Sequence, residues 1–273
     1  MNRSFETHQP VNLYVEIGKG EVSVTAAETT ESHVRVEGTD ADEVSVTYEN
    51  NDLRVIAPRR HGGLFGGEPK YVVDVTVPVA SNLATKTGSA DISTEGQLAA
   101  AQIKTGSGDC RLDTFTAEAD VETGSGDVSV AESHGDLLVK SGSGDVSVGT
   151  CLGELAVSTG SGDVEVGTSN GPVRIKTGSG DLKVVTANSD VSLATGSGDL
   201  SIGTARRGRH SAKGASGDVR IGIPAGTPVW TDITTVTGDI RNHLESVGAP
   251  AEGQDHVELQ AKTVSGDITL VQV

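Results

Sequence analysis

The most regularly spaced carboxylates in this chain belong to aspartates that follow Gly-Ser-Gly or a close variant of it. Successive members of the series are 18 residues apart. Carboxylates in such a column could coordinate Ca²⁺, which takes oxygen ligands, or could accept hydrogen bonds from backbone N–H groups in turns. The series consists of Asp91, Asp109, Asp127, Asp145, Asp163, Asp181 and Asp199.

These two roles differ in the spacing they require. Calcium binding would be similar to that of the nonapeptide repeat GGxGxDxUx, whose glycine-rich turns hold an ion between coils. Here six of the seven aspartates directly follow a glycine, and the intervening turns carry unlike residues such as Glu118, Pro172 and Asp190. Capping of each aspartate's own turn is therefore favoured, and no cofactor is expected. The alternative is calcium at Asp109, Asp127, Asp145, Asp163, Asp181 and Asp199.

A dense basic cluster, RRGRH, lies where the 18-residue spacing first slips to 19. Arg206, Arg207 and Arg209 could receive an acidic partner or a phosphate, because guanidinium groups pair well with carboxylates and phosphates. The aspartate edge of a neighbouring coil could equally be the acidic partner of these arginines. A solvated loop is the more common meaning of such a cluster, so these three arginines are partner-binding candidates only.

Catalytic and transition-metal chemistry find little support. Parallel β-helix enzymes that cleave acidic polysaccharides place aspartate clusters on a sheet face, whereas these aspartates belong to a repeated turn. No Trp or Tyr occurs between residues 72 and 229. The histidines show no HxH or HExxH spacing, and Cys110 and Cys151 lie in no CxxC motif. We therefore expect no enzyme and two structural thiols.

The charge balance excludes several classes of partner. Asp and Glu exceed Lys and Arg by 38 to 21, giving a net charge of −17 and a pI of about 4.7. Such a chain repels nucleic acid and anionic membrane surfaces. The ends read as carrying no targeting or anchoring signal, so a soluble cytoplasmic protein is expected. A location on the cell surface, reached by a route not visible in the sequence, is the alternative.

The apolar residues show a finer period within the 18-residue unit. Val128 and Val130 return nine residues later as Leu137 and Val139, each pair alternating with polar or small residues. This alternation predicts two short strands per unit, and such strands bury their apolar face only by stacking on the neighbouring units. The sequence therefore predicts an all-β, single-stranded parallel β-solenoid with 18-residue coils. Its corners are expected to need the positive φ of glycines such as Gly124 and Gly126.

Three segments are expected within one continuous structural unit. Residues 1–80 would form an irregular β cap, 81–205 the regular solenoid, and 206–273 irregular terminal coils with a cap near Trp230. A loop is predicted over 59–70. An imperfect cap would permit end-to-end self-association. Within the first segment, strands are predicted at 13–17, 21–25, 33–37, 44–48, 53–56 and 71–77.

Three stretches together give the chain a family resemblance. They are DVTVP at 74–78, the TGSGD copies, and IPAGTPVWTDITTVTGDI at 223–240. In these the chain resembles the bacterial putative-adhesin families with β-strand repeats of the SGDV type, which are of unknown function. The resemblance covers most of the chain. It implies a β-repeat fold and exposure at a surface, and it assigns no catalytic residues.

These observations favour a rigid, acidic, non-catalytic β-solenoid that acts as a protein-binding or scaffold module. The partner would be another protein. One alternative is a calcium-stabilised, surface-associated adhesin. A weaker alternative is a carbohydrate-active β-helix enzyme.

Overall fold

The computed structural model describes residues 1–58 and 69–273. In these ranges the chain is β-structure apart from turns, connecting segments and one short 3-10 helix, Ala41–Glu43. The chain forms two compact units: the N-terminal unit, Met1–Gly135, and the C-terminal unit, Asp136–Val273. The loop predicted over 59–70 lies almost wholly outside the described residues, and the predicted boundaries at 80 and 205 stay predictions.

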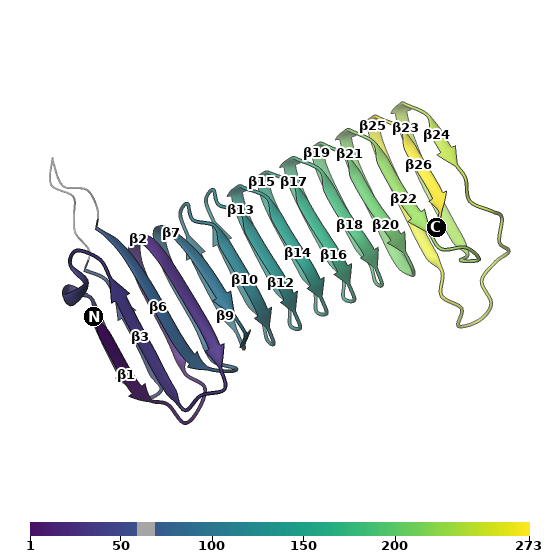
Figure 1. The fold of residues 1–273 in the computed structure, drawn as a ribbon. Coiled ribbons are helices and arrows are strands. Elements are labelled where there is room, and N and C mark those ends of the chain that lie inside the picture. Colours follow the sequence, from purple (N-terminus) through teal and green to yellow (C-terminus); the bar gives the residue numbers. More distant parts are fainter. Residues whose placement is uncertain (59–68) are drawn as a thin grey trace, which may run out of the picture. The chain divides into compact units, whose positions relative to one another are not determined.

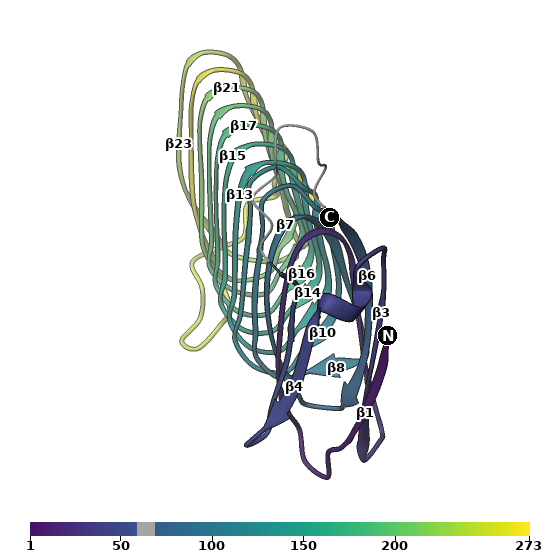
Figure 2. The ribbon, with the colours of Figure 1, turned by 90° about the vertical axis from the view of Figure 1, so that its left-hand side faces the viewer.

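Each coil of the C-terminal unit gives one strand to each of two parallel sheets, on opposite sides of the coil (Figures 1 and 2). In spatial order, the first sheet contains β13 (Leu137–Ser143), β15 (Leu155–Ser161), β17 (Val173–Ser179), β19 (Val191–Ser197), β21 (Gly208–Ser216), β25 (Val257–Ser265) and β23 (Val229–Thr237). The second contains β14 (Val146–Cys151), β16 (Val164–Ser169), β18 (Leu182–Ala187), β20 (Leu200–Ala205), β22 (Val219–Ile223), β26 (Ile268–Gln272) and β24 (Ile240–Asn242). The predicted parallel β-solenoid is confirmed.

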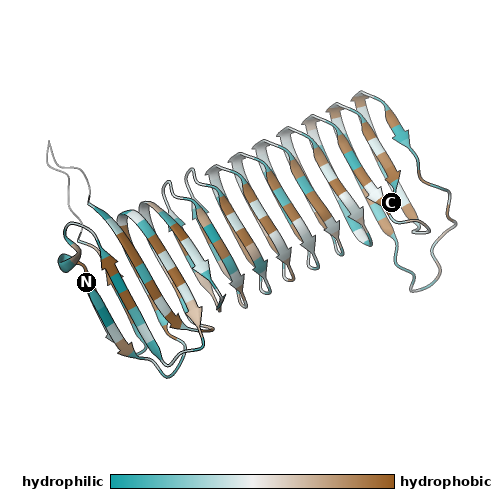
Figure 3. Ribbon diagram, viewed as in Figure 1, coloured by the Kyte–Doolittle hydropathy of each residue, from teal (hydrophilic) through white to brown (hydrophobic). Residues whose placement is uncertain are grey.

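The core of the C-terminal unit consists of columns of aliphatic side chains in strict register. Val157 pairs with Ile175 and Ile175 with Leu193 along the first sheet, and all three are at most 3% exposed. Polar residues alternate with them and face outward, as the hydropathy colouring of each strand shows (Figure 3). Burying one such side chain contributes roughly 1.5–3 kcal/mol. An 18-residue repeat of Val-x-Val is sufficient to build this core.

The last coils do not follow chain order. β25 pairs with β21 on one side and with β23 on the other, so the C-terminal coil is inserted between two coils that precede it in sequence. The segment 243–256 returns the chain to this gap. Among the described residues, β23 therefore pairs on one side alone, and Trp230 and Val236 on it are 53% and 70% exposed. The cap predicted near Trp230 is an open terminal coil.

In the N-terminal unit, β2 (Asn12–Ala27) is one long strand where two short ones were predicted. It pairs in parallel with β7 (Asn82–Glu95) and, along its other edge, with β5 (Asp52–Ile56) and β6 (Lys70–Pro78). Antiparallel strands then cover this end: β4 (Ser45–Glu49) on β5, β3 (Glu31–Glu37) on β6, and β1 (Asn2–Glu6) on β3. The parallel strands that follow β7 are β8 (Gln97–Leu98), β9 (Ala101–Thr105), β10 (Cys110–Phe115), β11 (Ala119–Thr123) and β12 (Val128–Ser133). Antiparallel pairing protects a sheet edge, as expected of a cap.

The corner glycines are needed chiefly because adjacent coils approach each other closely. The prediction of positive φ was wrong for Gly124 and Gly126, which do not appear among the positive-φ glycines. A Cβ on Gly126 would nevertheless lie 2.0 Å from the carbonyl oxygen of Gly108. In the C-terminal unit both constraints act together: Gly180 has φ 140°, and its Cβ would lie 2.1 Å from the oxygen of Gly162.

Both cysteines are buried and free. Burial raises the pKa of the Cys110 thiol to about 12 and that of Cys151 to about 11. Neutral buried thiols are poor nucleophiles and poor metal ligands. Their surroundings are those of the structural thiols expected from the sequence.

We expect Gly180→Ala to destabilise the protein by about 2–4 kcal/mol. The new Cβ would clash with the Gly162 carbonyl of the preceding coil, and alanine would also be strained at the positive φ of this position. Gly248→Ala is the matched control, because nothing lies within 4 Å of a Cβ built there, and it should change stability by less than about 0.5 kcal/mol. Urea unfolding followed by circular dichroism measures both. Equal stability of the two variants would contradict the close-approach argument.

Candidate functional site

The aspartate column forms a hydrogen-bonded ladder between coils. In the C-terminal unit, the backbone N–H of Asp181 donates to Oδ1 of Asp163 at 2.8 Å, and that of Asp199 donates to Oδ1 of Asp181 at 2.7 Å. The same bond joins Asp109 to Asp91 in the N-terminal unit at 3.0 Å. The predicted capping of each aspartate's own turn is thus corrected, because the carboxylate accepts the N–H of the corresponding aspartate in the following coil. The remaining rungs are Asp127 to Asp109, Asp163 to Asp145, Asp218 to Asp199, Asp267 to Asp218 and Asp239 to Asp267.

This ladder offsets the repulsion between stacked carboxylates. Unit charges about 5 Å apart repel by roughly 1 kcal/mol in water and by more near a protein surface, while each N–H donated to a carboxylate contributes about 1.5–3 kcal/mol. At the terminal rung, the Asp239 N–H and Arg241 hold the pKa of Asp267 below its usual value. Over residues 1–58 and 69–273, no three His, Cys, Asp or Glu side chains are grouped so as to hold a metal ion. Calcium binding stays an untested alternative.

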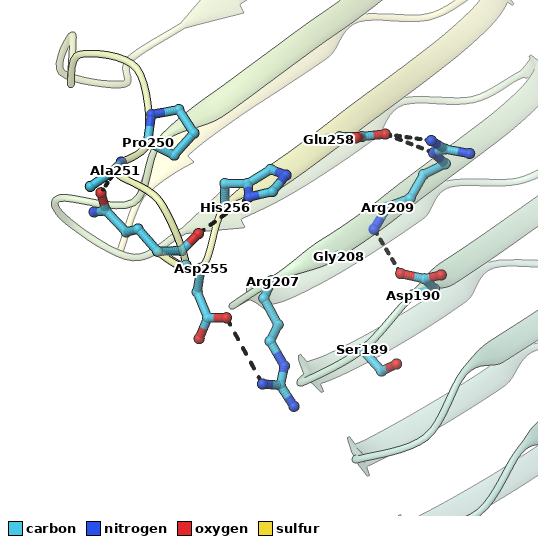
Figure 4. A pocket seen from close by; sticks show the side chains of 12 residues that line it. Ser189, Asp190, Arg207, Gly208, Arg209, Pro250, Ala251, Asp255, His256 and Glu258 are labelled. Carbon is cyan, nitrogen blue, oxygen red and sulfur yellow. Dashed lines mark hydrogen bonds and ion pairs between the residues drawn. The ribbon is translucent and has the colours of Figure 1, made fainter.

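The basic cluster opens onto a pocket of about 620 Å³ in the C-terminal unit. Three segments form its wall: the turn at Ser189 and Asp190, the start of β21, and the stretch from Pro250 to Glu258 (Figure 4). Arg207 and Arg209 line it, whereas Arg206 does not. The structure therefore brings two of the three predicted arginines together and leaves the third outside the site.

The two arginines are held differently. Arg209 forms an ion pair with Glu258 at 2.6 Å, which raises the pKa of its guanidinium, and its backbone N–H donates to Oδ1 of Asp190 at 2.9 Å. Arg207 donates from Nε to the Asn188 carbonyl at 2.9 Å, and its Nη1 lies 3.9 Å from Oδ1 of Asp255. Arg209 is thus fixed, while Arg207 reaches into the pocket with a looser partner.

His210 supports this site from the core side of β21. The sequence placed it in the basic cluster RRGRH, but its buried role was not predicted. It occupies the inward slot that Val191 and Leu259 fill in the neighbouring coils, and it is fully buried. Its Nε2 lies 3.0 Å from the Arg207 carbonyl oxygen, and its buried Nδ1 has no hydrogen-bond partner. Burial lowers the pKa of this imidazole, so a neutral ring donates from Nε2 and fixes the Arg207 backbone. The sequence signal for this buried role was a histidine at a position that Val or Leu occupies in the neighbouring coils.

A second hollow of about 400 Å³ adjoins the first across the Arg209–Glu258 pair. Trp230 forms one wall, and its indole meets the His256 ring edge-on at a centroid distance of 4.8 Å. On the adjoining row, Asp232 accepts from Gln260 at 3.0 Å and pairs with Lys262 at 3.1 Å, and these partners lower the pKa of Asp232. Sequence reasoning assigned Trp230 to a cap, because the out-of-order insertion of β25 leaves no mark in the repeat.

The family model of Toastrack DUF4097 matches residues 11–150 and again 135–271. No curated protein matches the chain. Among solved structures, a putative adhesin from Bacteroides fragilis is 14% identical with a TM-score of 0.43, covering 100% of this chain and 96% of its own. A putative lipid binding protein from Parabacteroides distasonis is 12% identical with a TM-score of 0.46, covering 100% and 96%. At such values these likenesses say nothing about ligands. The resemblance to the putative-adhesin family is confirmed.

We expect Asp181→Asn to keep the ladder, because an amide oxygen also accepts an N–H, and to change stability by less than about 0.5 kcal/mol. Asp181→Ala leaves the Asp199 N–H without this acceptor and should cost about 1–2 kcal/mol. Thermal unfolding in EDTA and in millimolar calcium measures both variants. A calcium-dependent rise in the wild-type midpoint that Asp181→Asn abolishes would contradict capping and establish the calcium alternative.

His210 should make stability fall on acidification. Its pKa is lowered in the folded state, so its contribution is complete above the unfolded value of about 6.5 and is lost as the pH falls through the folded value. Between the unfolded value of about 6.5 and the lower folded value, we expect wild-type protein to lose up to about 1.4 kcal/mol per pH unit more than His210→Val. Urea titrations at several pH values measure the difference, with the exposed-site variant His243→Gln as control. Parallel wild-type and His210→Val profiles would contradict the burial of an uncharged ring.

Proposed function

We propose that this chain, which belongs to the Toastrack DUF4097 family, is a non-catalytic binding module that recognises acidic segments of a partner protein at the Arg207 pocket. One observation carries the proposal. The Arg207 side chain is 58% exposed and has its nearest carboxylate at 3.9 Å, beyond hydrogen-bond distance. Its Nε is bonded to the Asn188 carbonyl, so the two Nη groups are the donors that remain available to the carboxylate of a ligand.

The charge of the protein sharpens this recognition. With a net charge of −17, most of the surface repels an acidic segment, and the aspartate ladder does so most regularly. The pocket is also lined by Asp190, Asp255 and Glu258, so the exposed Arg207 guanidinium is the one favourable contact that this part of the surface offers an acidic ligand. Repulsion elsewhere supplies specificity, which needs unfavourable alternatives as well as favourable contacts.

Asp255 acts as a stand-in for the ligand. It lies on the segment that closes the pocket and points its carboxylate toward Arg207 (Figure 4). A carboxylate from a partner would displace it and take a shorter, charge-assisted bond. The proposal therefore includes a weak internal competitor, whose removal should favour binding.

Two of the three carboxylates that line the pocket are firmly held, which supports a role in binding and not in catalysis. Asp190 accepts the Arg209 backbone N–H, and Glu258 is paired with the Arg209 side chain. Both carboxylates are thereby committed to holding the β21 strand.

The calcium-stabilised adhesin and the β-helix enzyme remain the alternatives. No helix in the described ranges is long and apolar enough to cross a bilayer. The cytoplasmic location stays a prediction, which cell fractionation tests.

Fluorescence anisotropy with a labelled hexaglutamate peptide tests the pocket. We expect Arg207→Ala to weaken binding about tenfold, equivalent to about 1.4 kcal/mol, and Asp255→Asn to strengthen it several-fold. Arg174→Ala is the matched control, since that exposed arginine pairs with Glu154 at 3.6 Å in a regular coil and should leave the affinity unchanged.

Two outcomes would overturn this function. Equal affinity of wild type and Arg207→Ala would remove the pocket from recognition. Displacement of the peptide by inorganic phosphate at comparable concentration would show a general anion site in place of one for acidic protein segments. Loss of affinity with rising salt accompanies the expected result, because the contact is electrostatic.

A further inference from the structure

The hollow beside Trp230 differs in chemistry from the Arg207 pocket. Its wall combines one exposed indole with two ion-paired carboxylates and an amide. From this arrangement we propose that it is a subsite for one ring of a neutral sugar, a pyranose in an oligosaccharide. This inference goes beyond the proposed function, because it uses a different pocket and a different class of ligand.

The charges of the hollow are compensated before any ligand arrives. Glu258 is paired with Arg209 at 2.6 Å, and Asp232 with Lys262 at 3.1 Å. An ionic ligand would have to break one of these pairs, and it would leave the other partner's charge exposed. A neutral ligand rich in hydroxyl groups can instead add hydrogen bonds to Arg209, Glu258 and Asp232, which line the hollow, without disturbing these pairs.

Trp230 supplies the apolar surface that a sugar ring requires. The indole is 53% exposed, and its edge-on contact with His256 at 4.8 Å fixes the plane of the ring. A pyranose has a face of C–H groups that covers an aromatic ring and a rim of hydroxyls that bonds to polar neighbours, matching the mixed lining of ligand pockets.

The sheet places the polar groups at a suitable spacing. Register aligns Arg209, Glu258 and Trp230 in one outward row. Gln260 and Asp232 stand in the next outward row, two residues further along the strands, at about 6.6 Å from the first. Across the sheet, neighbouring strands are about 4.8 Å apart. These distances are comparable to the width of a sugar ring, so one ring on Trp230 brings its hydroxyls to the Asp232–Gln260 pair.

The chain contains a single tryptophan, so fluorescence excited at the indole band reports on this hollow alone. We expect at least one of maltohexaose, cellohexaose and chitohexaose to change Trp230 emission saturably at about millimolar concentration. The same sugar should lower the acrylamide quenching constant at least twofold, because it covers the exposed indole face. Choline and polygalacturonate, a cationic and an anionic probe, should do neither.

Variants separate the sugar from other causes. Asp232→Ala and Gln260→Ala should weaken the sugar titration at least fivefold, whereas Val236→Ala is the matched control. Val236 lies on the same strand, is 70% exposed, and does not line the hollow. Arg207→Ala should leave the sugar titration intact while it weakens binding of the acidic peptide about tenfold, so that failure of either proposal is distinguishable from failure of the other.

Three outcomes would overturn the sugar subsite. One is the absence of any saturable change in Trp230 emission with each of the three neutral oligosaccharides at concentrations up to about 10 mM. Another is saturation by choline or by polygalacturonate in their place. The last is equal loss of the signal in Val236→Ala and Asp232→Ala, which would mean that the fluorescence follows the terminal coil as a whole.

Discussion

The close approach of successive coils at their glycine corners is the constraint on which the regular part of this structure depends. At Gly162 and Gly198, as at Gly180, a Cβ would lie 2.1–2.2 Å from a carbonyl oxygen of the adjacent coil. Without side chains there, the corners stack at the spacing that the sheets require. In the rungs described above, that spacing also brings an aspartate carboxylate within 2.7–3.1 Å of an N–H of the neighbouring coil. Glycine and aspartate therefore recur together, because glycine permits the close approach of the coils and aspartate accepts the backbone N–H that this approach brings near.

A regular ladder cannot by itself create a selective site. Each rung presents the same carboxylate in the same surroundings, so a ligand would find several equivalent positions and no unique orientation. Selectivity needs residues that occur once. In the C-terminal unit these appear where the repeat slips: Gly208 adopts φ 94°, His210 replaces an aliphatic residue, and the strand order changes.

The sequence was sufficient to predict the solenoid, its 18-residue period and the inward Val and Leu pairs, because these depend on local alternation repeated many times. It also marked the arginines at 206, 207 and 209, since they interrupt that period. It could not show which of them share a pocket. That depends on the segment 250–258, which is distant in sequence and joins β21 only through the insertion of β25. The role of Trp230 was hidden for the same reason, because its neighbours Glu258 and Gln260 follow it by a long connection.

Out-of-order insertion explains why the irregular end can carry chemistry that the regular coils cannot. If the chain had continued in sequence, Arg209 would have faced Trp230 directly, and Glu258 would have stood beyond both. The inserted strand places Glu258 between them instead, where it neutralises Arg209 and leaves Arg207 as the more loosely held cation. One strand exchange thus separates a pocket with a loosely held arginine from a hollow whose charges are paired. The two neighbouring surfaces share the Arg209–Glu258 wall, and this difference in charge pairing is the reason for proposing different ligands for them.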